Sequence, residues 1–422
     1  MCDRGPDEVM DERGATEAVL MDARLFENAT DKSAVTSAAP LRVTIVQPAL
    51  PKYRVPVFRE LANRPGIDLR IVYGTVEGLA NVAADRFQAI PSKRREWKLG
   101  GVSLMWHGAE WKFSSPQRSD VIVLRWAGRS VSLFAALLRA RLCGVPVVLW
   151  GHGYSKKEKR WWANVRNWMA SLATALVFYE PRTRDNFVSN GWDPCRLFVA
   201  LNAIDESDIE AARVWWLNHP DELARFQSEQ GLDQGPVILF VSRLTPENRL
   251  DLLVKATAEL AREFPALKTV IIGNGSAVRN RLRHLADEMG LQHNVVFEDG
   301  VYDELLLGPW FLSASVFCYP ANVGLSLIHA LWYGLPVVTS DNISIQNPEI
   351  VALEPGVNGS LYHHEDVSSL VAVLRRIIAD KTLREQMSQA ARQTVESKFS
   401  IKRMVDGLEQ AIRYASDSRP AR

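Results

Sequence analysis

From Trp310 to Val338 the chain carries no Asp, Glu, Lys or Arg, and this uncharged stretch constrains the fold more than any other segment. Hydropathy alone would favour a membrane span. The stretch also contains two prolines, two glycines, an asparagine and a histidine, which are unsuited to a spanning helix. These residues favour a buried unit in the core of an α/β domain.

The order of residues inside this stretch predicts a strand, a loop, a helix and a second strand. An apolar run ends at Pro320, a helix is expected to begin near Gly324 and to end at Gly334, and Pro336 opens the next strand. Such a unit presents the free N–H groups and the positive dipole end of its helix at the carboxyl edge of a parallel sheet. That edge attracts phosphate groups.

The composition indicates a folded protein with more than one domain. A length of 422 residues fits two or three domains, and 47% hydrophobic with 23% charged residues can form full-sized cores. The formal net charge of +1 excludes nucleic-acid binding driven by bulk charge.

The first 40 residues and the cysteines indicate the compartment. The first 40 residues are polar and acidic with no apolar segment, so no secretory signal is expected. The four cysteines show neither metal-ligand spacing nor a disulfide framework; they are Cys2, Cys143, Cys195 and Cys318. We therefore expect a protein that is cytoplasmic or peripheral on the cytoplasmic face of a membrane.

Predicted strands and helices alternate along the chain from residue 41 onward. The first series of buried-strand patterns comprises 41–46, 67–73, 121–124, 146–150, 175–179 and 197–201, and a second series comprises 237–241, 268–272, 295–297, 313–319 and 336–339. Between the first strands, residues 76–118 are predicted to form loops and short strands. The alternation implies two doubly wound parallel sheets with ligands at their carboxyl edges.

Five segments follow from this alternation. We predict a flexible tail over residues 1–40, a first Rossmann-like domain over 41–205, bridging helices over 206–233, and a second Rossmann-like domain over 234–400. A C-terminal helix and tail over 401–422 is expected to pack back on the first domain. A mis-called start codon is the alternative explanation for the tail.

Three signals in the second domain point to an anion. Gly273 and Gly275 follow a strand and precede a helix, where glycine lets backbone amides approach a phosphate. Arg243 follows the first strand of the same sheet and could hold a diphosphate through two parallel hydrogen bonds. A tight turn and a solvated arginine are the alternatives. The helix start at Gly324 is the third signal, and all three follow strands of one sheet, so they are expected to converge.

These residues also carry a resemblance to a known family. The segments 242–253 (Ser-Arg-Leu-Thr-Pro-Glu-Asn-Arg-Leu-Asp-Leu-Leu), 273–275 (Gly-Asn-Gly) and 322–329 (Asn-Val-Gly-Leu-Ser-Leu-Ile-His) resemble glycosyltransferase family 4, as do 151–153, 202–205, 334–338 and 358–359. The resemblance covers about residues 41–415. It implies the GT-B fold, in which two Rossmann-like domains face a cleft, and retaining, metal-independent sugar transfer.

The resemblance assigns roles to named positions. Arg243 corresponds to the arginine that grips the donor's diphosphate, and His152 to a histidine of the N-terminal domain that lies near the transferred sugar; both are predicted catalytic residues. A histidine satisfied at the end of a strand is the alternative for His152. The other predicted donor-binding residues of the motifs are Gly273, Gly275, Gly324, Leu325 and Ser326.

The chain departs from the family pattern at three places. The usual lysine falls on Asn248, the pair of glutamates falls on Ala321 and His329, and the usual glycine pair after the first strand is replaced by 51–54 (Pro-Lys-Tyr-Arg). Arg249 beside Asn248 is one substitute for the missing cation.

Other residues are predicted to compensate for these departures. Lys52 and Arg54 are weaker candidates for the cation, with acceptor or phosphate binding as their role. Asn322 could touch sugar hydroxyls, and His329 could bind ribose because imidazole has a donor and an acceptor. Glu349 lies where the family often has a residue close to the donor.

The leading hypothesis is an enzyme that transfers a sugar from a UDP- or GDP-linked donor to a glycan or lipid-linked acceptor, in cell-surface polysaccharide or glycolipid biosynthesis. No cofactor or metal is expected, because no metal-ligand cluster is visible in the sequence. The alternative is a catalytically inactive GT-B protein that binds nucleotide or glycan as a partner subunit. A GT-B epimerase or phosphorylase would need a carboxylate pair or a pyridoxal lysine that the sequence does not place.

Residues 156–172 form a predicted helix with tryptophans on one face and lysines and arginines elsewhere. Such a helix could lie on an anionic membrane surface. A core helix with a basic solvated face is the equal alternative.

Overall fold

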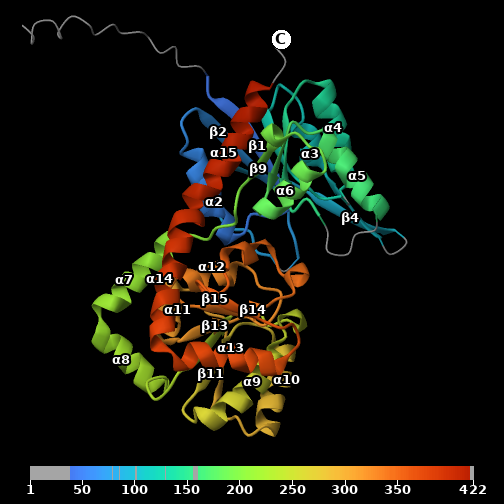
Figure 1. Cartoon of the computed structure of the whole chain (residues 1–422). Coiled ribbons are helices and arrows are strands. Elements are labelled where there is room, and N and C mark those ends of the chain that lie inside the picture. Colours follow the sequence, from blue (N-terminus) through green and yellow to red (C-terminus); the bar gives the residue numbers. More distant parts are fainter. Residues whose placement is uncertain are drawn as a thin grey trace, which may run out of the picture. The chain divides into compact units, whose positions relative to one another are not determined.

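The computed structural model describes residues 39–77, 79–84, 86–99, 102–128, 130–154 and 160–418 (Figure 1). The predicted tail over 1–40 therefore lies outside the described residues, apart from positions 39 and 40. Within the described residues, no helix is both long enough and apolar enough to cross a bilayer. The uncharged stretch is instead divided among α11, β13, α12 and β14, as the prolines and glycines indicated.

A seven-stranded parallel sheet forms the centre of the N-terminal half. Its strands run in the order β3-β2-β1-β6-β7-β8-β9. Their bounds are β1 Leu41–Gln47, β2 Ile67–Tyr73, β3 Gln88–Pro91, β6 Val121–Arg125, β7 Val147–Gly151, β8 Ala175–Phe178 and β9 Leu197–Val199. The central strands β6, β7 and β8 are apolar on both faces because helices cover both sides of the sheet.

Two apolar layers lie on the two faces of this sheet. Alternate residues of β6 enter different layers, with Val121 and Val123 in one and Ile122 and Leu124 in the other. The first layer contains α2 (Val55–Ala62) and α15 (Ile401–Asp417); the second contains α3 (Gly108–Phe113), α4 (Val131–Leu142), α5 (Arg160–Ser171) and α6 (Pro181–Ser189). The C-terminal helix thus packs back on the N-terminal half, as predicted.

The region 76–118 contains short strands, as predicted, and in addition a short helix that was not predicted. It forms β3, an antiparallel hairpin of β4 (Arg94–Leu99) and β5 (Val102–His107), and the short helix α3. A helix of six residues is too short to show a period in the sequence. Buried hydrogen bonds hold it instead: the Glu110 carboxylate accepts from Ser130 Oγ at 3.1 Å and from Ser132 Oγ at 2.5 Å.

His107 lies in the same buried cluster and predicts a pH-dependent stability. Its backbone N–H donates to Ser132 Oγ at 2.8 Å, and its side chain is only 4% exposed. Burial, with the positive charge of Arg94, lowers the pKa of His107 to about 4. The folded state therefore keeps a neutral imidazole while the unfolded chain takes up a proton, so stability falls as pH drops from about 6.5 towards 4.

We expect wild type to lose about 2 kcal/mol of unfolding free energy through this group between pH 7 and pH 5. Urea unfolding at the two pH values measures the loss, and His107→Gln should reduce it. The control His284→Gln changes a histidine that is exposed on α10 (Ser276–Glu288). Equal pH dependence in wild type and His107→Gln would contradict the assignment.

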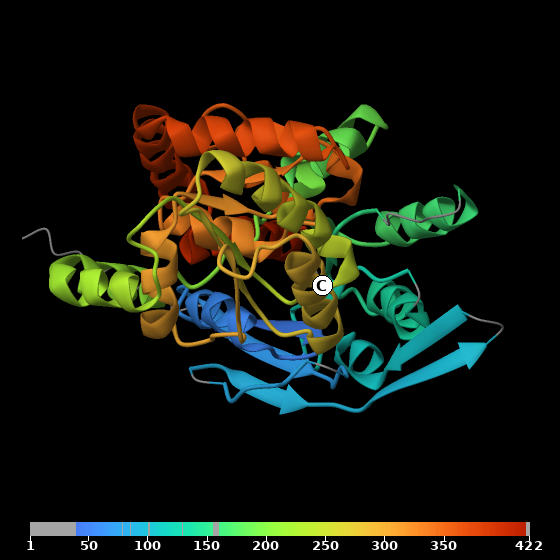
Figure 2. The ribbon, with the colours of Figure 1, turned by 90° about the horizontal axis from the view of Figure 1, so that it is seen from below.

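The C-terminal half contains a six-stranded parallel sheet in the order β12-β11-β10-β13-β14-β15. Its strands are β10 Val237–Val241, β11 Lys268–Ile272, β12 Val295–Glu298, β13 Val316–Cys318, β14 Val337–Ser340 and β15 Gly359–Tyr362. The helices are α9 Leu250–Glu263, α10 Ser276–Glu288, α11 Glu304–Ser313, α12 Leu325–Trp332, α13 Val367–Ala379 and α14 Lys381–Lys398. The bridging segment forms α7 Glu206–Asn218 and α8 Pro220–Glu229, and Figure 2 gives a second view.

Candidate functional site

The strand order reverses direction at one point in each sheet, between β1 and β6 and between β10 and β13. Loops diverge at such a switch point and leave a crevice at the carboxyl ends of the strands, where ligands of doubly wound sheets bind. In the C-terminal half, the loops that follow β10, β11 and β13 contain most of the predicted donor-binding residues.

The loop after β10 packs directly on the glycine turn after β11. The N–H of Leu244 donates to the Asn274 carbonyl at 2.8 Å, and the N–H of Ser242 donates to the Ile272 carbonyl at 3.1 Å. A Cβ atom at Gly273 would lie 1.7 Å from the Ser242 carbonyl oxygen. Gly273 is therefore required by the close approach of two backbones, in addition to the predicted approach of its amide to a phosphate.

Arg243 lies between these contacts, so the structure brings it together with the turn at Gly273 and Gly275. Its side chain is exposed and makes no ion pair or hydrogen bond with any residue in the described ranges. Burial raises the pKa of Tyr319, at the end of β13, while the positive charge of Arg243 acts against that shift. The charge of Arg243 therefore reaches the loop after β13, which is the third loop that contains predicted donor-binding residues.

The predicted anion-binding helix start is α12. Gly324 is its N-cap residue, and no side chain caps the first N–H groups, which include those of Leu325 and Ser326. The preceding loop is fixed by its neighbours: Asn322 has φ of 61°, and Asn347 Nδ2 donates to the Asn322 carbonyl at 3.3 Å. These amides can bind a negatively charged group.

His329 has a carboxylate partner that the sequence did not reveal. Its Nε2 lies 2.7 Å from Glu304 Oε1, and Tyr333 Oη donates to the same oxygen at 2.8 Å. Burial alone would raise the pKa of Glu304, but hydrogen bonds from His329 and Tyr333, with the charge of Lys52, hold it below its usual value. A carboxylate from α11 thus lies beside the position where the family's second glutamate is replaced.

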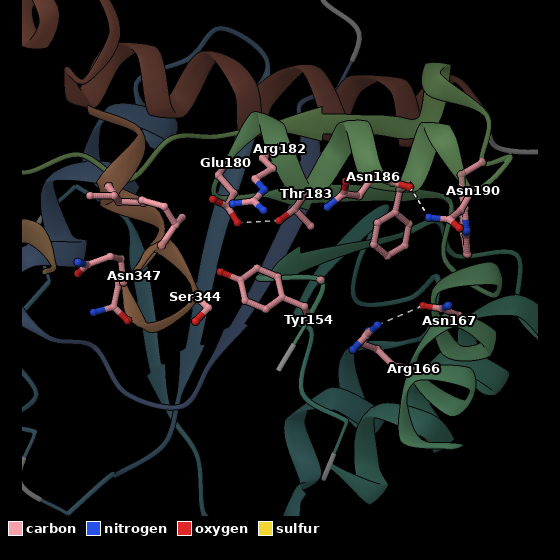
Figure 3. Close-up of a pocket in the computed structure, with 16 residues that line it drawn as sticks. Tyr154, Arg166, Asn167, Glu180, Arg182, Thr183, Asn186, Asn190, Ser344 and Asn347 are labelled. Atoms are coloured by element: carbon pink, nitrogen blue, oxygen red, sulfur yellow. Dashed lines mark hydrogen bonds between the residues drawn. The ribbon is translucent and has the colours of Figure 1, made fainter. Parts of the chain in front are cut away.

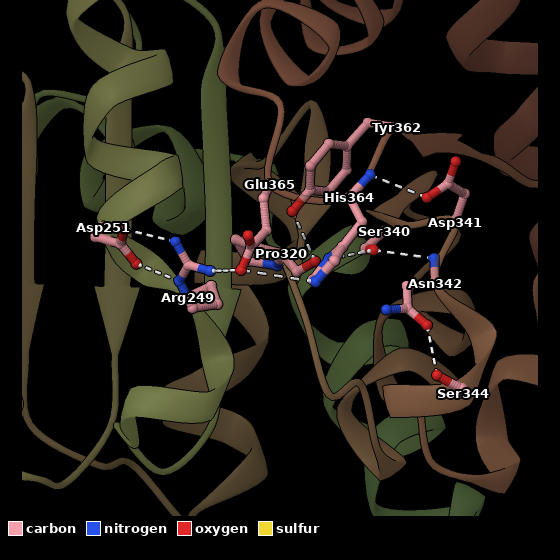
Figure 4. Close-up of polar contacts among 10 residues, drawn as sticks. All are labelled: Arg249, Asp251, Pro320, Ser340, Asp341, Asn342, Ser344, Tyr362, His364 and Glu365. Atoms are coloured by element: carbon pink, nitrogen blue, oxygen red, sulfur yellow. Dashed lines mark hydrogen bonds and ion pairs between the residues drawn. The ribbon is translucent and has the colours of Figure 1, made fainter.

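Arg249 is held away from the role predicted for it. Its Nε lies 3.0 Å from Asp251 Oδ1, and its Nη1 pairs with Glu365, so two carboxylates already neutralise the guanidinium (Figure 4). Its left-handed backbone, with φ of 53°, sets this direction. Asn248 is buried and donates to Tyr319 Oη at 2.8 Å, which makes it a structural residue in place of the usual lysine.

The contacts of Arg249 continue into a chain of polar groups (Figure 4). Glu365 lies 3.8 Å from His364 Nε2, and His364 Nδ1 lies 2.9 Å from Ser340 Oγ. Ser340 Oγ accepts from the N–H of Asn342 at 3.1 Å, and Asn342 Oδ1 accepts from Ser344. Arg249 therefore helps to position the loop after β14 rather than a ligand.

In the N-terminal half, His152 follows β7 and is exposed. Its ring centroid lies 4.9 Å from that of Tyr179. Arg54, in the turn after β1, places its guanidinium 4.7 Å over the Trp150 ring and 3.4 Å from Tyr179 Oη. Lys52 lies in the same turn. Its positive charge helps to lower the pKa of Glu304, which belongs to the C-terminal half.

Glu349 joins the two halves. It is 7% exposed and accepts a hydrogen bond of 2.8 Å from Asn202 Nδ2, in the segment that leads to the bridging helices. Burial raises the pKa of Tyr154 to about 12, and the charges of Glu180 and Glu349 add to the shift. Glu349, Glu180 and Tyr154 therefore lie near one another, where carboxylates from both halves face the same region.

A cavity of about 650 Å³ lies beside this region (Figure 3). One wall comes from the loop after β7, α5 and α6, and the other from residues 343–350. Amides, hydroxyls, ionic groups and rings line it; they include Glu180, Arg182, Arg166, Asn167, Thr183, Asn186, Asn190, Asn347, Tyr154, Phe187 and Trp192. Glu180 accepts from Thr183 Oγ1 at 2.7 Å. None of the predicted site residues lines this cavity. The residues that do line it could not be predicted from the sequence, because only the tertiary fold brings them together.

No group of three or more His, Cys, Asp or Glu side chains with the arrangement of a metal site occurs among the residues that the structure describes. The expectation that no metal is needed stays a prediction.

Residues 223–394 match the family model of the group 1 glycosyl transferases. A GDP-mannose-dependent alpha-(1-6)-phosphatidylinositol monomannoside mannosyltransferase of Mycolicibacterium smegmatis is 29% identical over 183 residues, which cover 41% of this chain and 46% of the relative. A D-inositol 3-phosphate glycosyltransferase of Streptomyces coelicolor is 31% identical over 42% of this chain and 41% of the relative. The chain thus spans less than half the length of these two relatives. An alpha-D-kanosaminyltransferase of Streptomyces kanamyceticus is 23% identical over 67% of this chain and 74% of the relative.

Solved structures share the fold. Anabaena HepE in complex with UDP superposes with a TM-score of 0.67 at 14% identity, over 88% of this chain and 100% of that one. The apo form of the lipopolysaccharide outer core galactosyltransferase WaaB gives 0.60 at 15% identity, over 88% and 99%. Together with the two parallel sheets, these neighbours show the GT-B fold.

Proposed function

We propose that the chain is a glycosyltransferase that moves a sugar from a nucleotide-sugar donor to a hydroxyl of an acceptor, because residues 223–394 match the family model of the group 1 glycosyl transferases. One observation carries the proposal: Arg243, the turn at Gly273 and Gly275 and the uncapped start of α12 follow neighbouring strands at the switch point.

This set of groups suits a departing nucleoside diphosphate. Sugar transfer develops negative charge on the leaving diphosphate while the sugar carbon becomes oxocarbenium-like. A guanidinium and several fixed N–H groups stabilise such charge without rearrangement. The donor is expected to be UDP- or GDP-linked, because HepE, which shares the fold, was solved in complex with UDP and one relative is a GDP-mannose-dependent mannosyltransferase.

The cavity between α5, α6 and residues 343–350 is the proposed acceptor site. Asparagine amides, Thr183 and Glu180 can bind sugar hydroxyls, and Trp192 offers an apolar ring face. His152 lies on the loop after β7, directly before Gly153, which lines the cavity, and its predicted role near the transferred sugar is part of the proposal.

The finer chemistry is part of the proposal. We expect retention of configuration, with the acceptor hydroxyl attacking on the face from which the diphosphate leaves, and transfer without a metal ion. The acceptor is expected to be a glycan or a lipid-linked sugar in cell-surface polysaccharide or glycolipid biosynthesis. A lipid-linked acceptor would bring the enzyme to the cytoplasmic face of a membrane, with residues 156–172 near an anionic surface.

The second candidate is a GT-B protein that binds nucleotide or glycan without transferring sugar. Two observations favour it: Arg249 is already neutralised by two carboxylates, and His329 is held by Glu304. Ala321 also cannot do the work of a glutamate.

Incubation of the full chain with a panel of UDP- and GDP-sugars separates the two candidates. The transferase hypothesis expects nucleotide release from at least one donor, by hydrolysis or by transfer to an added acceptor. Nucleotide binding without turnover of any donor would overturn it and support the second candidate.

Arg182→Ala tests the acceptor site. Arg182 is an exposed residue of the cavity lining, and its loss is expected to raise the KM for the acceptor about 10-fold while donor hydrolysis is unchanged. Ser189→Ala, an exposed residue of the same helix outside the lining, is the matched control. A change in donor hydrolysis with unchanged acceptor KM would place Arg182 on the donor side.

A further inference from the structure

Six large hydrophobic side chains are exposed on α3, α4 and α5, and we name them the α3–α5 patch. Each exposes between 36% and 87% of its surface; they are Trp111, Val131, Phe134, Leu138, Leu142 and Trp168. From this patch we infer that the N-terminal half docks on an anionic lipid bilayer. The inference goes beyond the proposed contact of residues 156–172, because most of the patch lies on α4, and it does not depend on the transfer chemistry.

The centre of the patch is a stripe along α4. Residues 131, 134, 138 and 142 recur at spacings of three and four, so they lie on one side of the helix. The opposite side, with Leu133, Ala136, Leu137 and Ala140, is buried against the sheet. Both faces of α4 are therefore apolar, but the described residues cover only one of them.

The neighbouring helices extend the stripe. Phe134 contacts Trp168 of α5 with ring centroids 4.9 Å apart, and Arg139 of α4 lies 4.5 Å over the Trp111 ring of α3. Figure 1 shows α4 and α5 on the outer side of this half, and Figure 2 shows the same helices from below. Tryptophan prefers the headgroup level of a bilayer, where its ring is partly apolar and its N–H can meet water.

The charges around the patch favour an anionic surface. Arg139 and Arg141 flank the α4 stripe, and Lys112 and Arg118 lie 6.0 and 5.7 Å from the Phe113 ring at the end of α3. None of these four cations forms an ion pair with a described residue. Glu110 is the one acidic residue in α3, α4 and α5, and it is buried against two serines. Cations at the edge of an apolar surface bind anionic lipid headgroups.

A second exposed apolar area differs from the α3–α5 patch in the charges around it, and these charges determine whether an anionic bilayer can bind. Val214 and Leu217 of α7 and Leu306 of α11 expose 47%, 50% and 63% of their surfaces. Acidic residues occupy the first turns of α7 and α8, and the arginines of these two helices, Arg213 and Arg225, form ion pairs with Glu210 and Glu222. In the described structure, α7, α8 and α11 therefore offer no unpaired cation to an anionic bilayer. The α7–α11 area therefore provides a matched control for the α3–α5 patch.

Helix α5 connects the patch to the cavity. Arg166 and Asn167 line the cavity, while the next residue, Trp168, belongs to the patch (Figure 3). A lipid-linked sugar held in the bilayer would therefore meet the cavity close to the docked surface.

Co-sedimentation of the full chain with vesicles tests the inference. Wild type is expected to pellet with phosphatidylcholine vesicles that contain phosphatidylglycerol, and much less with pure phosphatidylcholine. The variant Phe134→Gln/Leu138→Gln/Leu142→Gln should weaken the partition at least about 10-fold. Arg139→Gln/Arg141→Gln should weaken it about 10-fold on the anionic vesicles only.

The control Val214→Gln/Leu217→Gln/Leu306→Gln should bind like wild type, and a thermal melt shows that each variant is folded. Wild type that stays in the supernatant, or an equal loss in the control, would overturn the inference. A change from dimer to monomer in the α4 variant, without vesicle binding by wild type, would instead show an interface between copies of the chain. Nucleotide release in solution, measured in parallel, reports on the proposed transfer and not on docking.

Discussion

Replacing Arg243 by alanine is expected to lower kcat/KM for sugar transfer by about 100- to 1,000-fold. The structure places this exposed guanidinium between the Ser242 and Leu244 contacts that fix the glycine turn, at the carboxyl edge of the sheet. Because diphosphate charge grows as the sugar departs, the loss should be mostly in kcat rather than in nucleotide affinity. Steady-state nucleotide release with the donor identified by the panel measures it.

Two further variants test whether the loss of activity is specific to the guanidinium of Arg243. Arg243→Lys keeps the charge but loses the planar fork, so it should recover only part of the activity. Arg262→Ala, an exposed arginine on α9 without a polar partner in the described part of the chain, should behave like wild type. If Arg243→Ala turned over donor as fast as Arg262→Ala, the donor site would not be where we place it.

Gly273→Ala is expected to destabilise the protein by at least about 3 kcal/mol. The new Cβ would lie 1.7 Å from the Ser242 carbonyl oxygen, a backbone atom that cannot move without breaking the hydrogen bonds of the loop after β10. Urea unfolding followed by circular dichroism measures the free-energy difference.

Gly290→Ala is the matched control, because Gly290 has φ of 70° but no atom within 4 Å of its new Cβ. Only the left-handed backbone is then penalised, at about 1 kcal/mol. Similar losses in the two variants would mean that the loop after β10 can move aside. The packing argument for the glycine turn would then be wrong.

The sequence was sufficient for the architecture because its signals are local. Apolar strands with turns and amphipathic helices between them repeat along the chain, and chirality permits few ways to connect them. The same local pattern located the turn at Gly273 and the helix start at Gly324. These positions are fixed by where a strand ends, and both follow strands of the same sheet, as expected.

Pairings between side chains from distant elements were decided only by the tertiary structure. Arg249 was predicted at a donor site, but its left-handed backbone turns it towards Asp251 and Glu365, and Glu365 is 116 residues away. His329 was predicted to face ribose, but Glu304 of the preceding helix holds its ring. No period in the sequence encodes such contacts, since they depend on how whole elements pack.

Tertiary packing also determines which faces of the helices are covered and which are exposed. The sequence of residues 131–142 is apolar nearly all round, which is the pattern of a buried helix. Whether a chain covers such a helix on one side or both depends on its neighbours in space, and here α4 lies at the outside of its layer. Local order thus determined the fold and the loops that we propose to bind the donor's diphosphate, while packing alone determined the cavity, the carboxylate pairings and the α3–α5 patch.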